Sequence, residues 1–139
     1  MRLKRQTAPG WVELHDGAAL LCAPATTALV YAARAAATAL LVDLIAAGEA
    51  VTKVGAHIEG MPDLGAPEQA EATRQSMFLI SFAEMSAMDW RNVFDEDGQP
   101  IPFDPALLAQ LLASPQAADA FTRNYLADRI EVATEANFS

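Results

Sequence analysis

The chain has 139 residues, of which 53% are hydrophobic and 19% charged, and its formal net charge is −9. This length and composition predict one domain with a filled core, and they exclude a disordered chain, which combines low hydrophobicity with high charge. The net charge also argues against nucleic-acid binding, because a phosphate backbone repels an acidic surface. The only cluster of cations is Arg2, Lys4 and Arg5.

The first predicted element is a β-hairpin over residues 11–23. Residues 1–10 carry the basic start, which no apolar run follows, so we expect a flexible segment and no signal peptide there. From Trp11 to Leu14, apolar and polar residues alternate, as they do in a half-buried strand. Asp16-Gly17 is a strong signal for a tight turn, and Ala19–Cys22 can form the returning strand.

A long alanine-rich helix follows, within a helical part that we expect over residues 26–134. Thr26 or Thr27 can cap this helix, which is predicted to end near Ala47 with Gly48 close to the C-cap. Alanine favours helix and lets a second helix approach closely. A short helical piece is expected over residues 50–58.

The apolar stretch from Ala28 to Ala47 is not expected to cross a membrane. It carries Arg34 and Asp43 and consists mostly of alanine, whereas a spanning helix needs about 20 strongly apolar residues. The single cysteine, Cys22, cannot form an internal disulfide, and we interpret it as a small buried residue. We therefore expect a cytoplasmic protein that binds no membrane.

The next helix is predicted to begin at Pro67, after a loop rich in glycine and proline, and to end near Asp89. Its second half is apolar around most of its circumference, which is typical of a central core helix or of a partner-binding surface. Methionine suits surfaces that accept varied apolar partners. The predicted partner-binding residues, named here the Met/Phe surface, are Met77, Phe78, Phe82, Met85 and Met88, flanked by Trp90 and Phe94.

The remaining elements are a turn and two short helices. Asp97-Gly98 indicates a tight turn and a second short hairpin near residues 90–103. Asp104-Pro105 and Ser114-Pro115 each combine an N-cap residue with a first-position proline, so helices are predicted over 105–113 and 115–134. The fold class expected for this single domain is mainly α, a helical bundle with an N-terminal β-hairpin.

No constellation predicts catalysis, a cofactor or a metal. The acidic turn resembles a calcium loop, but Val93 stands where the first carboxylate ligand is needed. His15 and His57 have no metal-ligand spacing, and the many carboxylate pairs, such as Asp128 with Glu131, are typical of an exposed face. No phosphate loop or nucleophile motif occurs, and the C-terminal helices carry too few basic residues for a DNA-reading helix.

The order of these elements resembles the tail-assembly chaperones of long-tailed bacteriophages and gene transfer agents. The resemblance depends on the hairpin VELHDGAALLCAP before an alanine-rich helix, on WRNVFDEDGQPIPF before DPALLAQLL, and on the tail YLADRIEVATEANFS. Together these segments cover most of the chain, although none is a strict motif. The tail is similar to the end of the short form of such proteins.

The resemblance implies a non-enzymatic chaperone. Members of the family coat the hydrophobic, helical tape-measure protein before the tail polymerises. The expected partners are therefore a tape-measure protein or other tail proteins, with homo-oligomers. The alternatives are a head–tail connector or minor tail protein that stays in the particle, and an unrelated helical interaction module. A third class is an enzyme or small-molecule binder, which would need a deep polar pocket that holds His57 or clustered carboxylates.

Overall fold

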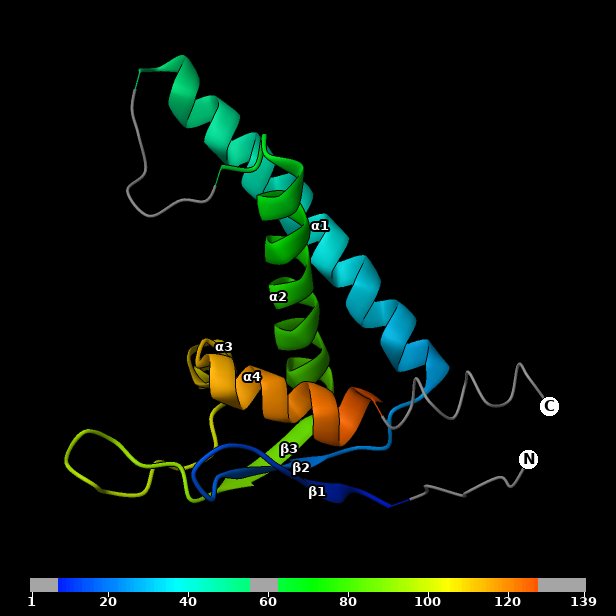
Figure 1. Ribbon diagram of the computed structural model, residues 1–139, viewed down its shortest axis with the longest axis vertical. Helices are drawn as coiled ribbons and strands as arrows, with labels where there is room; N and C mark the ends of the chain where they lie inside the picture. The colour runs from blue at the N-terminus through cyan, green and yellow to red at the C-terminus, as the bar shows by residue number, and fades with distance from the viewer. Residues whose placement is uncertain (1–7, 56–62, 128–139) are drawn as a thin grey trace.

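The computed structural model describes residues 8–55 and 63–127, and in this part of the chain the protein is mainly helical with a small antiparallel sheet (Figure 1). The elements in chain order are β1 (Gly10–Glu13), β2 (Ala19–Cys22), α1 (Thr27–Lys53), α2 (Pro67–Ser86), β3 (Ala87–Arg91), α3 (Leu108–Leu112) and α4 (Pro115–Phe121). A single 3₁₀ turn (Pro105–Leu107) precedes α3, and a π turn (Thr122–Ala127) follows α4.

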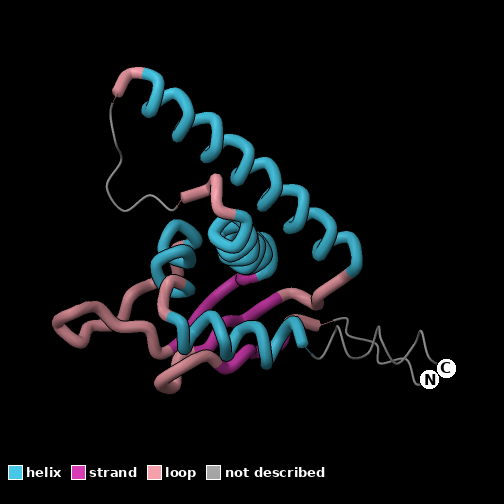
Figure 2. Tube along the Cα trace, turned by 45° about the horizontal axis from the view of Figure 1, so that its top comes forward, coloured by secondary structure: helices cyan, strands magenta, loops and turns pink. Residues whose placement is uncertain are grey.

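Only α1 and α2 are long, and they lie side by side along part of their length. The two short helices pack near the C-terminal end of α2, with α4 against the sheet (Figure 2). The predicted helical bundle is thus reduced to one long helix pair above a sheet with two short helices beside it.

The sheet has the strand order β1-β2-β3, and both neighbouring pairs are antiparallel. Asp16 and Gly17 join β1 to β2 with φ of 60° and 79°, the backbone that an Asp-Gly hairpin turn requires. Val12, Leu20 and Trp90 face one another across the three strands and are buried. This row gives the sheet its core face.

The predicted boundary of α2 near Asp89 is wrong. The helix ends at Ser86, Ala87 is extended, and the chain continues directly as β3, which pairs with β2. Trp90 lies opposite Leu20 in this pairing. Pairing with a distant strand outweighed the local helical pattern, as tertiary contacts commonly do for short apolar segments.

The predicted end of the first helix is wrong as well, because α1 passes through Gly48 and ends at Lys53. The Thr26 side chain accepts a hydrogen bond from the Leu29 amide, as the cap prediction requires. Beyond the helix, Gly55 has a φ of +74°, a value that glycine adopts without strain. The predicted helix over 50–58 is therefore the end of α1 as far as Lys53, and residues 56–58 lie outside the described residues.

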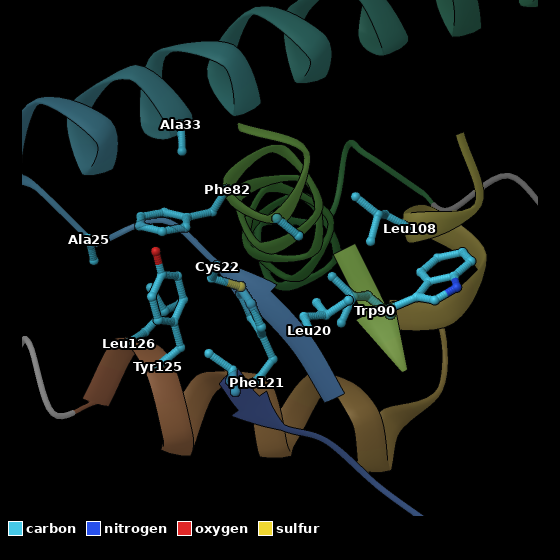
Figure 3. Packing of buried hydrophobic residues seen from close by; sticks show 13 residues of the cluster. Leu20, Cys22, Ala25, Ala33, Phe82, Trp90, Leu108, Phe121, Tyr125 and Leu126 are labelled. Atoms are coloured by element: carbon cyan, nitrogen blue, oxygen red, sulfur yellow. The ribbon is translucent and has the colours of Figure 1, made fainter. Parts of the chain in front are cut away.

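The core lies between the sheet, the C-terminal end of α2, the first turns of α1 and the two short helices (Figure 3). Phe82 is fully buried, and its ring meets the rings of Phe78 and Tyr125 edge to face, at centroid distances of 5.7 and 5.4 Å. The Tyr125 hydroxyl donates to the Ala23 carbonyl and ties the π turn to the chain after β2.

The cap predictions for the C-terminal helices are confirmed. The Asp104 carboxylate accepts from the Ala106 amide, and the Ser114 hydroxyl accepts from the Ala117 amide. After α4 comes the π turn, in which the Asn124 side-chain amide donates a hydrogen bond to the Glu13 backbone carbonyl at 2.7 Å. The last part of the predicted helix, residues 128–134, lies outside the described residues.

Arg91 crosses the outer face of the sheet, and its loss gives the first testable prediction. It stacks 4.6 Å from the centroid of the Trp11 ring and forms an ion pair with Glu13. We expect Arg91→Ala to lower the free energy of unfolding by about 1 kcal/mol, because an exposed ion pair and a cation–π contact each contribute a fraction of this. The measurement is urea unfolding followed by circular dichroism.

Arg74 provides the matched control. It forms an ion pair with Glu71 one helical turn away on the exposed face of α2 and touches no ring that the structure describes. We expect Arg74→Ala to leave the unfolding midpoint unchanged. Equal effects of the two substitutions would contradict a role for the Trp11 stack.

Candidate functional site

The seven residues of the Met/Phe surface do not form one surface. Phe82 and Trp90 belong to the core, with relative exposures of 0% and 6%, so their assignment as partner contacts is wrong for this structure. Phe82 fills the centre of an aromatic cluster, and the Trp90 indole N–H donates to the Ile101 carbonyl at 2.7 Å. Both side chains are used inside the fold.

The other five members are spread over different elements. Met77 and Phe78 are half-buried on α2, whereas Met85, Met88 and Phe94 are exposed. Because α2 ends at Ser86, Met88 lies on β3 and Phe94 on the loop that follows. A contact role for the exposed members stays a prediction.

A second exposed apolar surface lies on α1. Of its residues only Ala33 and Ala37 are fully buried, and they face α2 and the core. Tyr31, Val42 and Leu40 remain 63%, 59% and 48% exposed. Figures 1 and 2 show that no described element lies on the side of α1 away from α2.

This exposed side of α1 has a defined composition. At about 100° per residue, six exposed and uncharged side chains between Tyr31 and Ala46 fall within an arc of about 100°. Arg34 and Asp43 lie about 40° beyond its two edges. Within the arc, Ala28 precedes these residues, and Glu49 and Lys53 follow them about one and two turns after the last member. This outward face of α1 consists of Tyr31, Ala35, Thr38, Ala39, Val42 and Ala46.

The signal for this face is visible in the sequence. A helix that is apolar all round must be covered on more than one side. Leu29 and Leu44 supply the side that packs inward, and alanines fill the other side. The alanines allow close approach of a second helix, and they leave the side of α1 opposite that helix apolar as well.

By length and composition alone, α1 is also the one helix among the described residues that could cross a membrane. Only 11% of its most apolar 18-residue window is buried. Arg34 and Asp43 lie about 180° apart around the helix, so a spanning α1 could not turn both charges away from lipid.

The acidic turn uses its carboxylates to hold its own backbone. The Asp95 side chain accepts from the amides of Asp97 and Gln99, both at 2.9 Å, and Phe94 pairs with Pro100 across the turn. In residues 8–55 and 63–127, no group of three or more His, Cys, Asp or Glu side chains could hold a metal ion. His57 lies outside these ranges.

Cys22 is buried beside Ser86 in the core. Burial raises the pKa of the Cys22 thiol to about 11, and the neighbouring Ser86 hydroxyl lowers it to a smaller extent. The Ser86 oxygen has no partner with ordinary hydrogen-bond geometry, the only such buried side-chain oxygen in the described part of the chain. The thiol–hydroxyl contact is therefore weak, and burial dominates.

The second testable prediction concerns this thiol. At pH 8 a pKa of about 11 instead of 9.0 leaves about a hundredfold less thiolate, which is the reactive form. We expect Cys22 to react with a disulfide reagent at least about a hundredfold more slowly in the native protein than in urea. Equal rates would contradict its burial.

The same shift has a consequence for stability. The folded-state pKa of about 11 is higher than the ordinary value of 9.0, so the fold favours the protonated thiol. This contribution to stability is complete below pH 9.0 and is lost as the pH rises through about 11. Cys22→Ser is the control, since it should remove this part of the pH dependence.

The fold and its exposed face define a class of protein, a mainly helical domain with a small sheet and one long, largely uncovered apolar helix. The chain matches no protein-family model, no curated protein and no solved structure.

Proposed function

We propose that the protein is a tail-assembly chaperone of the kind found in long-tailed phages and gene transfer agents. It binds and shields a hydrophobic, helical tape-measure protein before the tail forms, and it works without catalysis. The observation that carries the proposal is the outward face of α1, where Tyr31 and Val42 stay more than half exposed on an apolar helix.

The outward face of α1 is in contact with water in the single chain. Large exposed apolar patches on soluble proteins mark interaction sites, because leaving them in water is unfavourable. Small side chains on the outward face let the backbone of a second helix come close, and Tyr31 and Val42 provide larger contacts. The partner that fits this face is an apolar helix.

The charge of the chain supports the same role. The four charged residues of α1 are Arg34, Asp43, Glu49 and Lys53, which sum to zero, so the whole net charge of −9 comes from the rest of the chain. A neutral apolar face can bind a client helix, while the acidic remainder keeps the complex dispersed.

Co-expression with the tape-measure protein of the same gene cluster tests the proposal. We expect most of the tape-measure protein to move from the insoluble to the soluble fraction when this chain is present, and the two to co-purify. If the soluble fraction is the same with and without this chain, the proposal fails.

An apolar face is also what a permanent subunit interface requires, so a head–tail connector or minor tail protein is the second candidate. Mass spectrometry of purified particles separates the two functions. A chaperone is missing from the finished particle, whereas a structural component is present in a fixed ratio to the tail subunits.

A further inference from the structure

We propose that the outward face of α1 binds the same face of a second copy of this chain, in an antiparallel pair that a client helix displaces. The displacement rests on the proposed function, whereas the pairing itself does not. The single chain exposes this face to water, and a second copy is the partner of matching chemistry present in every solution of the protein.

The six residues of the outward face are complementary to themselves. In an interface with two-fold symmetry, if residue i contacts residue j of the partner, then j contacts i. With the axis between Thr38 and Ala39, Tyr31 lies opposite Ala46 of the partner subunit, and Val42 lies opposite Ala35 of the partner subunit. Each large side chain meets a small one, and all of these positions are exposed in the single chain.

The charges around this face fit the same arrangement. In an antiparallel pair with two-fold symmetry, each edge of the face lies beside the same edge of the partner. Arg34 therefore lies on the same side of the interface as Glu49 of the partner subunit. At about 1.5 Å of rise per residue, the two residues are about 9 Å apart along the helix axis. Their long side chains can close this separation, and the contact occurs twice. The two copies of Asp43 lie about 14 Å apart along the axis, beyond the screening length of about 10 Å at 0.1 M salt.

The pairing is expected to be weak. One helix from each chain buries less than the roughly 1,200 Å² of a standard stable interface. The fraction of dimer therefore depends on the protein concentration. The face is covered in the dimer, and a client helix can still displace the second copy because the pairing is weak.

Sedimentation of the purified protein, without any client, from low micromolar to several hundred micromolar tests the pairing. We expect a monomer–dimer equilibrium, with a dissociation constant at least about tenfold larger for Val42→Asp, because two carboxylates would then enter an apolar contact. The matched control is Ala72→Asp, which adds the same charge at an exposed position of α2. It should leave the equilibrium unchanged.

Cysteine cross-linking tests the register. Ala39→Cys places two thiols beside the two-fold axis, within disulfide reach, whereas the two sites of Lys53→Cys are about 40 Å apart along the axis. Mild oxidation should produce a covalent dimer of the first variant only, because the native Cys22 is buried.

Three results would overturn the inference. They are a monomer at every concentration, a dimer that Val42→Asp leaves intact, and equal cross-linking of both cysteine variants. Flotation of a monomeric wild-type protein with phosphatidylcholine vesicles, lost in Val42→Asp, would assign the face to lipid instead. None of these measurements contains a tape-measure protein, so the pairing can fail while the proposed function stands, and the reverse also holds.

Discussion

Phe82→Ala is expected to lower the free energy of unfolding by about 3 to 5 kcal/mol, the usual range for removing a buried phenylalanine. Phe82 is fully buried and contacts two other rings, so the substitution leaves a cavity in the centre of the core. Urea unfolding followed by circular dichroism measures the loss.

Met85 is the control from the same turn of α2. It is 44% exposed, and we expect Met85→Ala to cost less than about 1 kcal/mol. If Phe82→Ala left stability intact and weakened only client binding, then Phe82 would be a surface contact and not part of the core.

Val42→Asp carries the second large expected effect. Placing a carboxylate in the middle of the outward face should reduce the tape-measure protein recovered in the soluble fraction at least about tenfold, because a charge in an apolar contact loses its hydration without a partner. Stability should change by less than about 0.5 kcal/mol, since the residue is 59% exposed and makes no core contact.

Ala72→Asp serves again as the matched control and should leave the recovery unchanged. Equal loss with both variants would point to a general effect of added negative charge. Full recovery with Val42→Asp would move the client to another surface, with Met85, Met88 and Phe94 as the next candidates.

Features set by local chemistry were predictable from the sequence. The turn at Asp16-Gly17 and the caps at Thr26, Asp104 and Ser114 all lie where the residue types indicate. Each depends on a few neighbouring residues, namely a side-chain acceptor near free amides or a backbone that tolerates positive φ. Such signals need no knowledge of distant segments.

Features set by distant contacts were not predictable. The change from α2 to β3 after Ser86 depends on pairing with β2, more than sixty residues earlier in the chain. The burial of Trp90 follows from the same pairing. An apolar pattern indicates that Phe82 and Met85 must avoid water, but it does not tell which one faces the core and which one stays exposed.

The candidate site shows the same division. The sequence indicated an apolar helical surface but assigned it to the methionine- and phenylalanine-rich helix, in which the fold buries Phe82 and half-buries Met77 and Phe78. Alanine contributes little apolar area, so the long alanine-rich helix is a weaker signal for an interface than the larger side chains of α2. Exposure in the folded chain, as at Tyr31 and Val42, is what identifies α1 as the open surface.

Hydrogen–deuterium exchange of the protein alone and in complex with the tape-measure protein tests whether the client binds to α1. The free protein is measured at a concentration where it is monomeric. We expect slower exchange across α1, Thr27–Lys53, in the complex, because a bound helix covers its outward face and suppresses local opening. Unchanged exchange in α1, with protection appearing only elsewhere in a complex of equal affinity, would contradict it.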